Sequence, residues 1–141
     1  MKFLEFISNN EKETFEYARK LATMLKPSTT ILIKGDLGAG KTVFAKGLAK
    51  GLGIEKTITS PTFTIFNIYN GIMPFYHFDL YRIEDANELD AIGLDEYLFD
   101  KDAIKLIEWP QILGSRALPN VVEIEIVKQS ESKRMIRKGD I

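Results

Sequence analysis

Gly35-Asp36-Leu37-Gly38-Ala39-Gly40-Lys41-Thr42 is the most informative segment of this sequence. It matches G-x-x-x-x-G-K-[ST], the pattern of a loop that holds phosphate groups between a strand and a helix. The apolar, β-branched segment 30–34 before it predicts a buried strand, and residues 43–52 after it predict a helix. An ordinary glycine-rich turn does not require Lys-Thr at the start of the next helix. We therefore interpret residues 35–42 as a phosphate-binding loop, or P-loop.

The chemistry of such a loop predicts its ligand. Glycines allow a backbone conformation in which successive N–H groups converge on an anion. The first turn of the following helix adds unpaired N–H groups and the positive end of its dipole. Lys41 is predicted to bind the β- and γ-phosphates, and the hydroxyl of Thr42 is predicted to bind Mg²⁺. The loop therefore predicts a nucleoside triphosphate with magnesium.

Length and composition narrow the class of protein. The 141 residues suit one domain spanning 1–141, and 45% hydrophobic residues are typical of a soluble globular protein. The formal net charge of −1 argues against broad neutralisation of nucleic-acid phosphates. The absence of cysteine excludes a disulfide framework and a cysteine-based zinc site. The sequence shows no signal-peptide core and no apolar run near the ~18 residues of a membrane span, so we expect a cytoplasmic protein without membrane association.

Periodicity along the rest of the chain predicts an α/β, P-loop NTPase-like three-layer fold. Residues 64–69 and 73–78 flank Asn70-Gly71, which is a strong hairpin signal. This antiparallel pair predicts a mixed central sheet and not a purely parallel one. Other predicted elements are helices over 11–25, 84–89 and 94–99, a strand over 103–107, an edge strand with one wet face over 121–127, and a short strand over 134–137.

Two carboxylates follow predicted strands and are candidates for the chemistry. Asp79 ends the strand that contains residues 74–78, and Glu108 ends the strand over 103–107. A P-loop site needs an acidic residue at the end of a neighbouring strand to hold the metal or its waters. We expect at least one of the two to serve magnesium, although the pattern alone does not divide their roles.

Other residues allow two interpretations each. The hydroxyl-rich segment 60–64 is either a switch-like loop that senses the γ-phosphate or a polar turn that opens a strand. His77 is the only histidine, and we interpret it as packed and hydrogen-bonded, not as a base. Trp109 is either a core residue or an aromatic side chain beside the nucleotide. Tyr81-Arg82 is either a surface pair or an arginine that faces phosphate.

ATP is the nucleotide that the sequence favours. A guanine-reading Asn-Lys-x-Asp segment is absent, which disfavours a Ras-like GTPase. The arginines form no cluster of the kind that a small-molecule kinase needs in its lid; they are Arg19, Arg82, Arg116, Arg134 and Arg137. Two alternatives to an ATPase stay open on pattern alone, namely a free-standing phosphotransferase and a non-catalytic module that senses nucleotide.

Four sequence blocks together resemble one known family, the bacterial TsaE (YjeE) proteins. Besides the P-loop, the blocks are Ser60-Pro61-Thr62-Phe63-Thr64, His77-Phe78-Asp79-Leu80-Tyr81-Arg82 and Ile107-Glu108-Trp109-Pro110, in the family's order and spacing. The resemblance covers residues 10–110 and implies a P-loop fold with a mixed sheet. It further implies weak ATP hydrolysis that supports the partner proteins TsaB and TsaD. TsaD transfers a threonylcarbamoyl group to adenosine 37 of tRNAs that read ANN codons, so tRNA would be an indirect partner.

The same resemblance implies a role for each site residue. The residues it assigns to ATP or ADP are Asp36, Leu37, Gly38, Ala39, Gly40, Lys41, Thr42, Val43, Ser60, Thr62, Trp109 and Arg134. It assigns magnesium to Thr42 and Glu108. It assigns the catalytic roles to Lys41, Glu108 and Asp79, with Asp79 near the metal and the attacking water. Ser60 and Thr62 would belong to the switch-like loop.

Overall fold

The computed structural model describes residues 3–36, 38–59, 61, 65–114 and 116–139. Within these residues the strands are β1 (Phe3–Ser8), β2 (Thr30–Lys34), β3 (Phe66–Asn70), β4 (Pro74–Asp79), β5 (Ile104–Glu108), β6 (Val121–Lys128) and β7 (Arg134–Gly139). The helices are α1 (Glu11–Ala22), α2 (Lys41–Gly51), α3 (Ala86–Ile92), α4 (Asp95–Leu98) and the 3₁₀ helix η1 (Pro110–Leu113).

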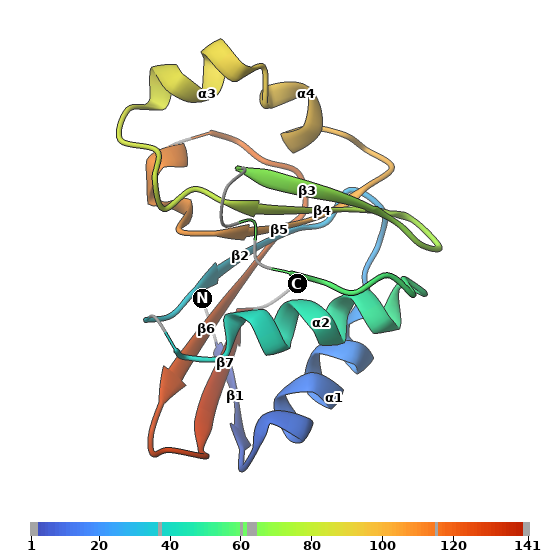
Figure 1. Ribbon diagram of the computed structural model, residues 1–141, viewed down its shortest axis with the longest axis vertical. Coiled ribbons are helices and arrows are strands. Elements are labelled where there is room, and N and C mark those ends of the chain that lie inside the picture. The colour runs from blue at the N-terminus through green and yellow to red at the C-terminus, as the bar shows by residue number, and fades with distance from the viewer. Residues whose placement is uncertain (1–2, 37, 60, 62–64, 115, 140–141) are drawn as a thin grey trace.

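All seven strands of the described chain form one mixed sheet in the order β1-β7-β6-β2-β5-β4-β3 (Figure 1). Strands β6, β2, β5 and β4 run parallel in its centre. The β3–β4 pair at one edge and the β6–β7–β1 group at the other are antiparallel. The α/β fold with a mixed sheet is therefore confirmed.

Two details of the predicted sheet are wrong. The strand predicted at the edge, β6, lies between β2 and β7, because an alternating pattern reports one wet face and not the position in the sheet. The predicted wet face is confirmed, since Glu123 and Glu125 are partly exposed while the alternating Val122 and Ile124 are buried. The strand at this edge of the sheet is β1, which was not predicted from the sequence.

The predicted hairpin is confirmed as β3 and β4, although Thr64 lies outside the described residues. Asn70 pairs with Pro74, so the turn consists of residues 71–73. The Ile72 N–H donates to the carbonyl of Leu52 at 2.7 Å, and a Cβ on Gly71 would overlap that same oxygen. Glycine is therefore required here because the turn lies directly against the end of α2.

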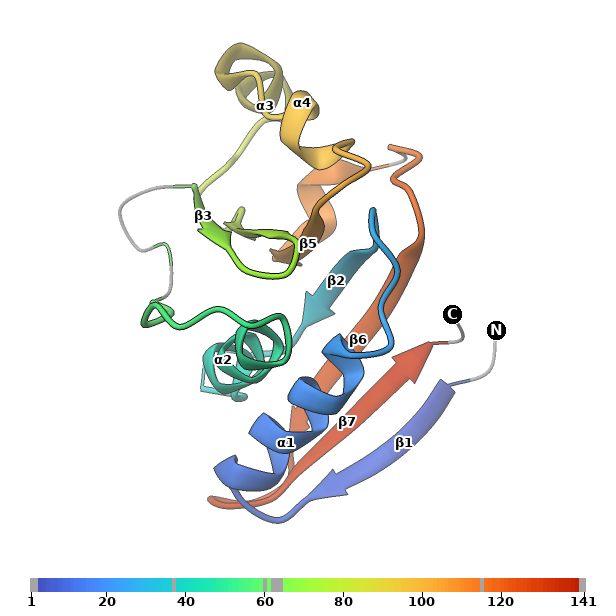
Figure 2. The same cartoon turned by 90° about the vertical axis from the view of Figure 1, so that its right-hand side faces the viewer.

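Helices cover both faces of the sheet, giving three layers (Figure 2). On one face, α1 and α2 pack over a core that includes Ile31, Phe44 and Leu48. On the other face, α3 and α4 pack with η1 over β4 and β5 through a second core that includes Phe78 and Leu89. The arrangement places the start of α2 beside the carboxyl ends of β2, β4 and β5.

Helix α2 is held directly against α1 by two glycines one turn apart. A Cβ on Gly47 would lie 2.8 Å from the Cβ of Ala18, and a Cβ on Gly51 would lie 2.6 Å from that of Ala22. Both distances are shorter than van der Waals contact. Helix α1 ends at Ala22, earlier than the predicted residue 25, and α2 starts two residues before the predicted residue 43.

Candidate nucleotide-binding site

The P-loop ends in an open helix N-terminus. Gly38 and Gly40 have φ angles of 80° and 104°, which lie in the left-handed region that favours glycine. Gly40 is the N-cap of α2 and has no side chain with which to occupy the first-turn N–H groups. These N–H groups and the helix dipole are therefore available to an anion.

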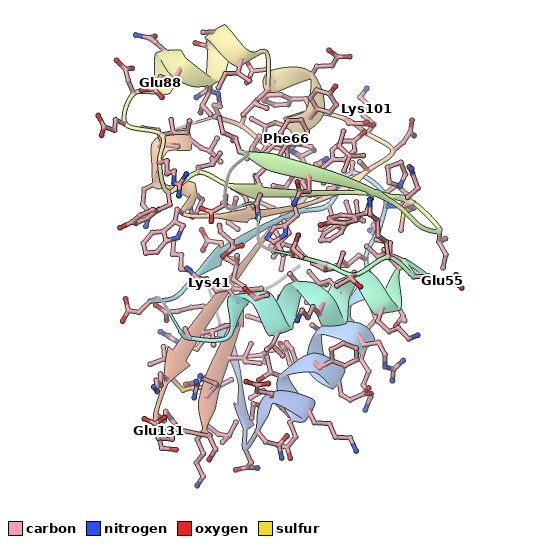
Figure 3. The ribbon with its side chains drawn as sticks, in the orientation of Figure 1. Lys41, Glu55, Phe66, Glu88, Lys101 and Glu131 are labelled. Carbon is pink, nitrogen blue, oxygen red and sulfur yellow. The ribbon has the colours of Figure 1, made fainter. Side chains whose placement is uncertain are left out.

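Lys41 is the first residue of α2 and extends toward the ends of β4 and β5 (Figure 3). Only 7% of it is exposed. Its Nζ lies 3.9 Å from Oε1 of Glu108 and 4.1 Å from the centroid of the Trp109 ring. The lysine predicted to bind phosphate is thus held between a carboxylate and an aromatic face, at the open end of the helix.

The two predicted carboxylates lie side by side. Asp79 and Glu108 are partners in the parallel register of β4 and β5 and both line the pocket. Oδ1 of Asp79 accepts a hydrogen bond from the Tyr81 N–H at 3.0 Å. Burial raises the pKa of the Asp79 carboxyl above its usual range, and the neighbouring charge of Glu108 acts in the same direction. The site therefore concentrates negative charge where a divalent cation would relieve it.

His77 is completely buried, and its Nε2 lies 2.6 Å from Oε2 of Glu108. Its ring stacks on Phe75 at 6.2 Å between centroids. The prediction of a packed, hydrogen-bonded histidine is confirmed, but its partner was not foreseen. Residues two apart in a strand share a face, so His77 and Asp79 both face Glu108 once the register of β4 and β5 is known.

Trp109 lies at the pocket, whereas Arg82 lies on the surface. Trp109 lines the pocket and has a φ of 55°, an uncommon conformation for a non-glycine residue. The exposed ring of Tyr81 lies 4.9 Å from the Trp109 ring between centroids. Arg82 is exposed and is not among the residues that line this pocket, so it belongs to the surface.

The pocket has a volume of about 530 Å³ and draws on segments far apart in the chain. Two of its walls were not predicted from the sequence, one from the start of α1 and one from the β6–β7 turn; they are made by Asn10, Glu11, Thr14, Glu131 and Ser132. Figure 3 labels Glu131 at the tip of this hairpin. No local motif marks these residues, because they reach the pocket only through the order of the strands.

Arg134, the first residue of β7, also lines the pocket. Its guanidinium donates to the backbone carbonyls of Gly38 and Ala39 in the P-loop. Further N–H groups of the same side chain donate to carbonyls of the β6–β7 turn. The geometry therefore directs this arginine to the backbone of the loop, whereas the resemblance implies a contact with the nucleotide.

The structure gathers most of the predicted site residues into one pocket. Those that line it are Gly38, Gly40, Lys41, Thr42, Val43, Asp79, Glu108, Trp109 and Arg134. Ala39, between the lining residues Gly38 and Gly40, is buried, and Asp36 is exposed and does not line the pocket. Leu37, Ser60 and Thr62 lie outside the described residues, so their roles stay predictions.

The described residues contain neither a ready-made metal cluster nor a helix that could span a membrane. No group of three or more His, Cys, Asp or Glu side chains is placed to hold a metal ion within the described ranges. A magnesium ion here would depend on Thr42, Glu108 and oxygens from the phosphates and water, which is the usual manner of binding for this cation. In the part of the chain that the structure describes, no helix is long and apolar enough to cross a membrane.

A glycine-rich loop after a buried strand, a helix that starts at its lysine, and carboxylates on adjacent parallel strands define a P-loop protein. The family model described as "Threonylcarbamoyl adenosine biosynthesis protein TsaE" matches residues 8–136. The chain therefore belongs to the TsaE family, as the sequence blocks predict.

Individual relatives agree with this assignment. The Bacillus subtilis "tRNA threonylcarbamoyladenosine biosynthesis protein TsaE" is 42% identical over 137 residues, covering 96% of this chain and 85% of that protein. The protein of the same name from Borreliella burgdorferi is 44% identical over 110 residues, covering 77% and 78% of the two chains. The crystal structure of Bacillus subtilis YdiB matches with a TM-score of 0.80 and 37% identity, covering 97% of this chain and 84% of that one.

Proposed function

We propose that this chain binds and slowly hydrolyses ATP as an accessory protein of TsaB and TsaD. In this role it supports threonylcarbamoylation of adenosine 37 in tRNAs that read ANN codons, in the cytoplasm. The family and its relatives are named for threonylcarbamoyladenosine biosynthesis, which supports the pathway. The roles of ATP, magnesium and the two partners are proposals that the geometry of the pocket supports.

The observation that carries the proposal is the position of Lys41. Its ammonium lies at the open N-terminus of α2, 3.9 Å from Glu108, with Asp79 in the neighbouring register position. The N–H groups of the loop and Lys41 would bind the phosphates of ATP. Thr42 and Glu108 would hold Mg²⁺, which would neutralise charge on the phosphates and on the paired carboxylates.

The chain's own side chains have distinct tasks in this proposal. His77 fixes the carboxylate of Glu108 through its 2.6 Å contact, so that the other oxygen faces Lys41 and the pocket. Asp79 would orient the attacking water, since it lines the pocket beside Glu108. Trp109 and Tyr81 form an aromatic wall beside Lys41.

The composition of the pocket also supports slow turnover without partners. Among the described residues that line it, Arg134 is the single arginine, and its guanidinium is bonded to backbone carbonyls. An arginine that faces the transferred phosphate accelerates many P-loop enzymes by roughly 10³–10⁵. A partner that supplies such a charge would therefore raise the rate.

ATP turnover, measured alone and with TsaB and TsaD, tests the proposal. We expect partner-stimulated turnover in the wild type and a loss of roughly 100-fold or more in Asp79→Asn and Glu108→Gln, with the fold retained. Glu123→Gln, on the wet face of β6, is the matched control and should keep the wild-type rate. The proposal fails if the partners neither bind nor stimulate this chain and tRNA modification proceeds without it.

A further inference from the structure

One guanidinium joins the P-loop to a hairpin that lies 95 residues away in the sequence. Nε of Arg134 donates to the carbonyl of Ala39 at 2.9 Å, and Nη2 donates to that of Gly38 at 3.2 Å. Nη1 donates to three carbonyls of the β6–β7 turn, those of Ser130, Lys133 and Glu131, at 2.9, 3.1 and 3.3 Å. Each acceptor is a backbone oxygen.

The geometry points to Arg134 as a positioning residue that holds the P-loop in its phosphate-binding conformation. The inference rests on the proposed function, in which this loop binds the phosphates of a nucleotide. When successive N–H groups of a loop converge on an anion, the carbonyls between them face away from it. Arg134 binds carbonyls of this kind, so it fixes the loop without competing for the anion.

The need for such a contact follows from the sequence of the loop. Gly38 and Gly40 supply the left-handed conformations, but glycine loses more backbone freedom on ordering than any other residue. A loop with three glycines therefore loses much conformational entropy when a ligand orders it. The guanidinium of Arg134, which β7 positions, donates hydrogen bonds to the loop and would order it before the ligand binds. Less entropy would then be lost on binding.

The number of N–H groups on Arg134 distinguishes positioning of the loop from a direct contact with the nucleotide. A guanidinium has five N–H groups. The N–H groups on Nε and Nη1 donate to backbone carbonyls, and one of the two N–H groups on Nη2 donates to the carbonyl of Gly38. One N–H is left for a ligand, whereas five contacts hold the backbone.

Arg134→Ala tests the inference, with Arg134→Lys as the conservative variant. Arg137→Ala is the matched control, because Arg137 lies on the same strand and forms its ion pair with Glu125 at 3.2 Å. Amide hydrogen exchange is measured in nucleotide-free protein. We expect faster exchange at residues 38–42 in Arg134→Ala, unchanged exchange in β5, and an intermediate result for Arg134→Lys.

Calorimetric affinities for ADP and for inorganic tripolyphosphate provide the second readout. Arg134→Ala should weaken both by the same factor, on the order of tenfold, because a disordered loop affects any phosphate chain. A loss confined to ADP, with unchanged exchange in the loop, would show that Arg134 contacts the nucleoside and would overturn the inference. Faster exchange throughout the chain would also overturn it, since Arg134 would then support the whole fold. If the wild type binds neither ligand, the proposed function fails, while the exchange experiment still tests the contact with the loop.

Discussion

Lys41, Glu108 and His77 are three buried polar residues in contact through Glu108, and the proposed function uses the first two to bind ATP and magnesium. Glu108 contacts Lys41 through one oxygen and His77 through the other. A buried carboxylate without such partners would be costly, because water no longer solvates it. The same contacts that make Glu108 tolerable in the interior also fix the direction in which it faces the pocket.

His77 should therefore contribute to stability through Glu108. His77→Phe keeps a planar ring but leaves one carboxylate oxygen without its partner, so we expect a loss of about 1–3 kcal/mol in the free energy of unfolding. His77→Gln retains an amide donor and should lose less. Urea denaturation measures both. Equal losses in the two variants would contradict a role for the hydrogen bond.

Site residues that lie within one continuous segment could be predicted from the sequence, whereas contacts between distant segments could not. The P-loop is continuous, and Asp79 and Glu108 each follow a strand that the pattern shows. The contact of Arg134 with the P-loop depends on how the β6–β7 turn approaches α2. A sequence pattern does not report how two distant segments pack against each other.

The contact between α1 and α2 determines how firmly the P-loop helix is held. Gly47 and Gly51 face Ala18 and Ala22 at distances that exclude any side chain. A small-residue surface of this kind lets two helix backbones approach closely, so dispersion contacts extend along the whole crossing. The position of Lys41 at the start of α2 depends on this contact.

Gly47→Ala should destabilise the protein, although alanine favours a helix. In an exposed helix the exchange stabilises by roughly 0.5–1 kcal/mol, so a measured loss isolates the clash with α1. We expect a loss of about 1–3 kcal/mol from overpacking. Lys50→Ala, at an exposed position of α2, is the control and should change stability by less than about 0.5 kcal/mol. Thermal unfolding measures both, and a stabilised Gly47→Ala protein would contradict the packing.

Elements could be predicted where periodicity and turn signals are strong, and their placement in the sheet could not. The helix at 11, the hairpin around Gly71 and the strand that ends at Glu108 are confirmed. Strand β1 was missed, and β6 was assigned to the wrong position. In the final order β6 and β5 flank β2, so sheet neighbours are far apart in sequence. This arrangement depends on tertiary packing, and alternation within one strand does not encode it.

Across the whole molecule, the charged site at the carboxyl end of β5 has a counterpart at the amino end. Lys105 is fully buried, and its Nζ donates to the carbonyls of Asp100 at 2.7 Å and Ser28 at 3.1 Å. The Tyr76 hydroxyl donates to Oδ2 of Asp100 at 2.6 Å. Burial lowers the pKa of Lys105 to about 8, while the charge of Asp100 opposes that shift. This lysine therefore ties two loops together at a cost in solvation.

The pH dependence of stability should reveal that cost. The ordinary pKa of lysine is 10.5, so between pH 8 and 10.5 the unfolded chain holds a proton that folded Lys105 has released. Raising the pH across this window therefore favours the folded state. Relative to Lys105→Met, the wild type should gain about 2 kcal/mol in the free energy of unfolding between pH 7 and 9.5. A difference that stays constant or falls with pH would contradict the lowered pKa. Tyr76 does not interfere, because its pKa is raised to about 12.

In the proposed function, the P-loop, Lys41 and Glu108 form one binding site for ATP and magnesium. Calorimetric titration of ATP into the wild type, Lys41→Ala and Glu108→Gln, each with and without Mg²⁺, tests it most directly. We expect one saturable site in the wild type and tighter binding with Mg²⁺. Lys41→Ala should lose roughly 10- to 100-fold in affinity, and Glu108→Gln should show little magnesium dependence. ATP binding that neither variant changes, or no binding by the folded wild type, would contradict it.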